Sequence, residues 1–83
     1  MLFTNWKQKY IEQRRKEEMY LEGLAIQASI FKHRAEAYND IKSSDIARII
    51  IRQMSFYAKE FNLMDYLTKL YETYPELKER KEE

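Results

Sequence analysis

Residues 21–38 read LEGLAIQASIFKHRAEAY, and this stretch decides the fold because its apolar residues recur at steps of three and four. Such spacing places them on one face of an α-helix, as a seam like that of a coiled coil. The members of the seam are Leu21, Leu24, Ala28, Phe31, Ala35 and Tyr38. A wider apolar face predicts contact with more than one neighbour. The residues that widen the seam are Ile26, Ile30, Ala37 and Ile41.

The rest of the chain predicts further helices. Ser43 and Ser44 follow a break at Lys42 and are suitable N-caps for a helix that begins at about residue 44. Its apolar stripe is Ile46, Ile50, Met54, Tyr57 and Phe61. The sequence NLMD at residues 62–65 resembles a capping box, which favours a break near Asn62. The apolar pattern nevertheless continues almost in phase, so one uninterrupted helix remains an alternative.

These patterns predict an all-α domain, either a long helical hairpin or a three-helix bundle, that is completed by self-association. The expected helices span about residues 5–41, 44–61 and 63–74. We expect residues 1–74 to form a single helical domain and residues 75–83, which follow the break before Pro75, to form a charged, solvated tail. If the two seams face each other, the buried core contains Leu24, Phe31, Ile50, Met54, Tyr57 and Phe61.

The first expected helix is too long for a compact domain of 83 residues. Unbroken from residue 5 to residue 41, it measures about 55 Å, far more than one small core covers. It either breaks at Gly23, the only glycine, or stays whole and is covered by another chain. We favour the whole helix, because no proline or asparagine follows Gly23. Residues 12–18, EQRRKEE, then form a solvated stem supported by ion pairs such as Arg14–Glu18.

Two groups of apolar residues are candidates for a protein interface. A small apolar head precedes the stem and consists of Phe3, Trp6, Tyr10 and Ile11. The third expected helix carries more apolar groups than one narrow stripe can bury, and its candidates are Tyr66, Leu70, Tyr71 and Tyr74. Tyrosine is common at interfaces, where its ring is buried and its hydroxyl stays wet. In an antiparallel homodimer the head of one chain meets the tyrosine surface or the head of the other.

Composition excludes several functions. The formal net charge of +1 gives no global attraction to nucleic acid or membrane, and no run of apolar residues is long enough to span a bilayer. The chain has no cysteine and a single histidine, His33, so it lacks a metal-binding cluster and a nucleophile with a nearby base. We therefore expect no enzyme, no cofactor, no metal and no small-molecule substrate, and a cytoplasmic protein.

The sequence favours a small, non-enzymatic, helical protein-binding module with an accessory or regulatory role, acting through an exposed aromatic and apolar helix surface as a homodimer. The alternative is a nucleic-acid-associated factor that uses the basic, aromatic-interleaved segment from Trp6 to Lys16. The basic residues of this segment are Lys7, Lys9, Arg14, Arg15 and Lys16. A salt titration separates the two hypotheses, because phosphate contacts weaken steeply as salt increases.

Overall fold

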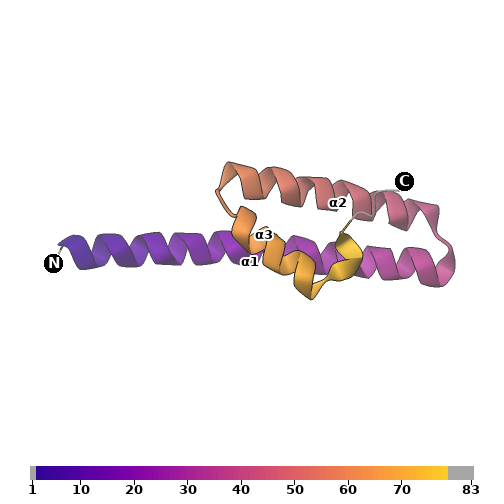
Figure 1. Ribbon diagram of the computed structural model, residues 1–83, viewed down its shortest axis with the longest axis horizontal. Helices are drawn as coiled ribbons and strands as arrows, with labels where there is room; N and C mark the ends of the chain where they lie inside the picture. The colour runs from indigo at the N-terminus through magenta and orange to yellow at the C-terminus, as the bar shows by residue number, and fades with distance from the viewer. Residues whose placement is uncertain (1, 79–83) are drawn as a thin grey trace.

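The computed structural model describes residues 2–78, with side chains from Lys7 onward, and within this range it is an all-α fold without strands. Its elements are α1 (Leu2–Tyr38), α2 (Ile41–Glu60), α3 (Met64–Thr73) and the short 3-10 helix η1 (Pro75–Leu77). Figure 1 shows α1 and α2 side by side as a hairpin, with α3 and η1 packed across it. The predicted all-α class and the three-helix arrangement are confirmed.

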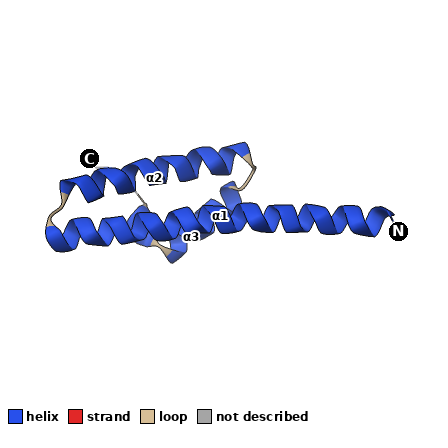
Figure 2. Cartoon of the chain, turned by 180° about the vertical axis from the view of Figure 1, so that it is seen from behind, coloured by secondary structure: helices blue, strands red, loops and turns tan. Residues whose placement is uncertain are grey.

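α1 passes through Gly23 without a break. It contains 37 residues, and the long axis of the molecule, 57 Å, is close to the length of this one helix. The preference for an unbroken first helix is therefore confirmed. Residues 2–16, here called the arm, project beyond the end of α2 and the start of α3, as Figures 1 and 2 both show.

The turn between α1 and α2 lies earlier than the sequence patterns predicted. Asn39 adopts a left-handed conformation with φ 53°, and the amide of Asp40 donates to the carbonyl of Ala35 at 3.1 Å. This is the arrangement with which asparagine commonly ends a helix. Asp40 is the N-cap of α2, and its carboxylate accepts from the amide of Lys42. The prediction of a serine cap was wrong, because Ser43 is buried and its hydroxyl donates to Asp40 instead.

A second asparagine ends α2. Asn62 has φ 62°, and the amide of Leu63 donates to the carbonyl of Ala58 at 2.7 Å. The favoured break near Asn62 is confirmed, but the capping box is not. Leu63 occupies the N-cap position of α3 and makes no side-chain cap hydrogen bond. Leu63 and Ala58 are both fully buried, which supplies the apolar contact that usually accompanies this helix ending.

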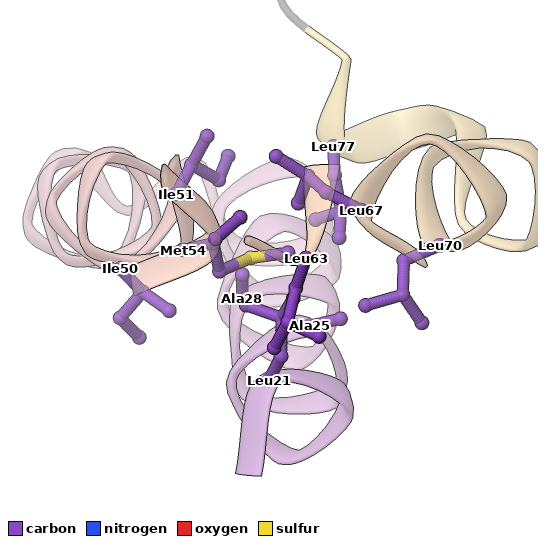
Figure 3. Packing of buried hydrophobic residues seen from close by; sticks show 11 residues of the cluster. Leu21, Ala25, Ala28, Ile50, Ile51, Met54, Leu63, Leu67, Leu70 and Leu77 are labelled. Carbon is purple, nitrogen blue, oxygen red and sulfur yellow. The ribbon is translucent and has the colours of Figure 1, made fainter. Parts of the chain in front are cut away.

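The core lies where the three helices meet, and Figure 3 shows side chains from each of them converging on it. Alanines on α1 and α2 let the helix axes approach closely, while leucines and Met54 fill the space between them. The core residues are Leu21, Ala25, Ala28, Ile50, Ile51, Met54, Ala58, Leu63, Leu67, Leu70 and Leu77.

The predicted core was partly correct. Ile50 and Met54 are buried, whereas Leu24, Phe31 and Tyr57 are only partly buried at its edge. Phe61 was assigned wrongly, since 41% of its surface is exposed. The reason is the position of α3. Its leucines occupy the flank of the hairpin next to Ala25 and Ala28, so the face of α1 that carries Leu24 and Phe31 lies at the edge of the core.

The C-terminal segment corrects another prediction. Residues 75–77 are not a solvated tail, because η1 packs against both α1 and α3 and Leu77 is fully buried. Glu76 accepts a hydrogen bond from Ser29 of α1. Proline is suited to the first position of such a turn, since its fixed φ fits and its missing amide needs no partner. Residues 79–83 of the expected tail lie outside the described residues.

Candidate functional site: the open face of the helical hairpin

An aromatic groove lies between α1 and α2. It encloses about 360 Å³ and is formed by the two helices of the hairpin alone. The ring of Tyr57 lies at its centre, with its centroid 4.7 Å from that of Tyr20 and 4.5 Å from that of Phe61. The residues that line the groove are Tyr20, Leu24, Gln53, Phe56, Tyr57, Glu60 and Phe61.

The groove faces away from α3 because of the helical repeat of α1. Glu22, which lies close enough to Tyr66 of α3 to raise its pKa, and Ser29, which donates a hydrogen bond to Glu76 of η1, lie on one flank of α1. Tyr20 projects about 200° round the helix from Glu22 and therefore lies on the opposite flank. One side of the hairpin is thus covered by α3, and the other is left without a packed element among the described residues.

Apolar side chains continue along this uncovered side, which we call the open face. On α2 and at its C-cap they follow steps of three, seven, one and four residues, and Phe56 is the most exposed of them at 75%. Exposed apolar side chains gathered on one side of a hairpin commonly mark a contact surface. The residues of the open face are Tyr20, Leu24 and Phe31 of α1, Ile46, Ile49, Phe56 and Tyr57 of α2, and Phe61, the C-cap of α2.

The two ends of the open face differ in charge. At the arm end, Glu60 lines the groove and Glu17 lies close enough to Tyr57 to affect it. Burial, with a further contribution from Glu17, raises the pKa of Tyr57 above its ordinary value, so its hydroxyl is neutral near pH 7. At the other end the guanidinium of Arg34 lies 6.0 Å from the ring centroid of Phe31.

The predicted head falls partly outside the described side chains. Tyr10 and Ile11 are both more than half exposed on the arm, where no other helix packs against them. The side chains of Phe3 and Trp6 lie outside the described residues. The stem has the expected Arg14–Glu18 ion pair, at 3.5 Å, together with a hydrogen bond from Gln13 to Glu17.

The second group of predicted interface residues packs against the chain's own core. Leu70 is buried in that core. Tyr66, Tyr71 and Tyr74 are partly buried against it, and burial together with Glu22 raises the pKa of Tyr66. None of the four belongs to the open face.

The basic residues of the nucleic-acid alternative do not share a face. At about 100° per residue, Lys9 and Lys16 lie about 20° apart round the arm, as do Lys7 and Arg14, and these two pairs and Arg15 point in three well-separated directions. Arg14 is in addition paired with Glu18. The described residues therefore present no continuous basic stripe along the arm.

None of the residues of the open face was among the predicted site residues. Their signal was present as a second pattern on α2, in which Ile46, Ile49, Gln53, Phe56 and Glu60 alternate steps of three and four beside the core stripe. Two apolar stripes on one helix indicate two partners. Only one of those partners is found among residues 2–78.

Comparison with protein-family models, with curated proteins and with solved structures gave no match. The class of the protein is therefore given by its own fold: a small all-α hairpin with a third helix on one side and an open apolar face on the other. Among the described residues, none of the helices is long and apolar enough to span a membrane. The same residues hold no cluster of three or more His, Cys, Asp or Glu arranged for a metal ion.

Proposed function

We propose that this chain is a protein-binding module whose open face receives an amphipathic helix of a partner protein. The observation that carries the proposal is the aromatic groove, with Phe56 three-quarters exposed at its edge. A helix laid along the hairpin would complete a four-helix arrangement, with apolar residues at steps of three and four against the open face.

Charge defines the partner further. Glu17 and Glu60 at the arm end favour lysine or arginine on the incoming helix, and Arg34 at the far end favours a carboxylate. The partner helix is therefore apolar on one side, basic at one end and acidic at the other. Binding of this kind suits an accessory or regulatory protein.

The proposal is tested with synthetic helical peptides in a titration calorimeter. The matching peptide carries a leucine stripe with lysines at one end and glutamates at the other, and a second peptide has the same stripe with every charge made glutamate. We expect the matching peptide to bind at least about tenfold more tightly than the all-glutamate peptide, a difference of about 1.4 kcal/mol.

A variant of the protein locates the contact. Phe56→Glu places a charge at the edge of the groove without touching the core and should weaken binding of the matching peptide about a hundredfold. Ile41→Glu is the control, because Ile41 is equally exposed, at 76%, but does not line the groove. Equal binding by both variants, or no difference between the two peptides, would contradict the proposal.

A further inference from the structure

A second apolar surface runs along the outer side of α1. Its residues alternate steps of four and three, which is the spacing of a coiled-coil seam. The members of this outer seam are Met19, Gly23, Ile26, Ile30, His33 and Ala37. Met19, Ile26 and Ile30 are exposed by 63%, 42% and 51%.

Most of the outer seam has no packing partner among the described residues, although Nε2 of His33 lies 3.7 Å from the carboxylate of Glu76 in η1. Ile30 projects about 180° round the helix from Leu21, which is buried in the core. The space in front of Gly23 is empty, since a Cβ added there would meet nothing within 4 Å. Among the described residues, α1 is therefore apolar on two opposite sides, and only one of them is covered.

The size of the side chains makes this seam complementary to itself. If a second copy lies antiparallel with its Ala28 level with this Ala28, each layer pairs a residue with one that complements it in volume. Met19 then faces Ala37 of the second copy, Gly23 faces His33, and Ile26 faces Ile30. A large side chain meets a small one in the outer layers, and two isoleucines meet in the inner ones.

The residues beside the seam also bear on the orientation. Asp40, three residues beyond the seam, lies outside α1 as the N-cap of α2, and its carboxylate accepts from the amide of Lys42 and the hydroxyl of Ser43, so it forms no part of the seam. On one flank of the antiparallel pair Tyr20 lies near Arg34 of the second copy, a favourable cation–aromatic pair. On the other flank Glu22 lies near Glu36 of the second copy, a repulsion that limits the affinity.

We propose that two copies of this chain associate antiparallel along the outer seam of α1. The contact extends over residues 19–37, a length of about 27 Å, so the interface is small and the association is weak. The dimer uses Tyr20 and Arg34, at the edge of the open face, and leaves the α2 residues of that face free. It does not rest on the proposed function, because separate variants alter the outer seam and the α2 side of the open face.

A matched pair of double variants tests the surface. Ile26→Glu with Ile30→Glu places charges on the outer seam, and Ile46→Glu with Ile49→Glu places the same charges on the open face, at isoleucines of similar exposure, 40% and 56%. In sedimentation equilibrium at high micromolar concentration, the parent and the open-face variant should show twice the monomer mass, and the outer-seam variant should show the monomer mass.

Several results would overturn the proposal. A parent chain that is monomeric under these conditions excludes the dimer. Loss of the dimer in the open-face variant, with the outer-seam variant still dimeric, assigns the contact to the other surface. Gly23→Leu shows whether loss of the dimer could result from unfolding of the chain. The space in front of Gly23 is empty, so this variant should keep the helix content of the parent. Its dimer should nevertheless dissociate about tenfold more readily.

Cysteine substitution tests the orientation, because the parent has no cysteine. Met19→Cys mixed with Ala37→Cys should give a disulfide-linked dimer on mild oxidation. Neither variant alone should do so, because in the antiparallel pair the two copies of residue 19 lie about 27 Å apart along the helix axis. Efficient cross-linking of either variant with itself would show a parallel pair, and absence of cross-linking in the mixture would exclude this register.

Discussion

The hydroxyl of Ser29 donates a hydrogen bond to the carboxylate of Glu76, which lies 47 residues further along the chain. This bond fixes η1 against the middle of α1, next to His33, whose Nε2 lies 3.7 Å from the same carboxylate oxygen. The hydrogen bond from Ser29 lowers the pKa of Glu76 below its ordinary value of 4.5, and the nearby charges of His33 and Lys32 act in the same direction.

This bond makes stability depend on pH. Because the pKa of Glu76 is lower in the folded chain than in the unfolded chain, its contribution is fully present above about pH 5 and is lost as the pH falls through the lowered folded value. Ser29→Ala should reduce the free energy of unfolding by about 1 kcal/mol at pH 7 and by less at pH 3. Urea unfolding at both pH values measures this, with Ser55→Ala as the control. An equal loss at the two pH values would contradict the assignment.

Leu77 should be essential for stability although it lies near the end of the described chain. It is fully buried, so Leu77→Ala removes apolar contacts and leaves a cavity, at a cost of about 2–4 kcal/mol in the free energy of unfolding. Its exposed neighbour is the control, and Lys78→Ala should change stability by less than about 0.5 kcal/mol. If both variants unfold at the urea concentration of the parent, residues 75–77 are the solvated tail that the sequence predicted.

Asn62 should tolerate glycine but not alanine. Its φ of 62° lies in the left-handed region, where a Cβ costs about 1 kcal/mol and glycine costs nothing. Asn62→Gly should keep or raise the melting temperature, and Asn62→Ala should lower it by several degrees. Gln53→Ala, in the helical part of α2, serves as the comparison. The turn geometry is wrong if alanine at residue 62 is as stable as glycine there.

Gly23→Ala should stabilise the chain by about 1 kcal/mol. Gly23 lies in the interior of α1 with a normal helical conformation, and the added methyl group meets open space. Thermal unfolding at several low protein concentrations measures the change, because a melting temperature that does not vary with concentration excludes a contribution from the proposed dimer. A chain that turned at Gly23 would instead lose stability on this substitution.

The sequence was sufficient to predict the helices but not which of their faces pack. The spacing of Leu21, Leu24 and Ala28 predicted α1, and Gly23 was rightly taken as part of it. α1 and α2, however, each carry more than one apolar stripe, and periodicity does not rank them. The structure packs the stripe richer in alanine, because small side chains at Ala25 and Ala28 allow α2 and α3 to approach α1 together.

The turns show the same limit. Asn39 and Asn62 are both residues that end helices in the left-handed conformation, and this signal was available from their type alone. Ser43, Ser44 and Asp40 are all residue types that commonly occupy the N-cap of a helix, so residue type alone did not identify the cap of α2. Burial decided between them, since Ser43 lies inside the molecule and Asp40 at its edge. The open face, in turn, could only be located once α3 had been placed on the other side.

α1 is one continuous helix, but its two halves differ in stability. Its packed half, around Ala28, shares the cooperative unfolding of the core, so amides there exchange with solvent only when the whole domain opens. Residues 7–16 are held by their own backbone bonds and a few pairs such as Arg14–Glu18, and a solitary helix of that length is marginal in water. Their amides therefore exchange through local fraying. A ligand that touches the arm will slow amide hydrogen exchange there and leave the exchange rate near Ala28 unchanged. Amide exchange in the arm therefore measures binding, and amide exchange near Ala28 measures unfolding of the whole domain.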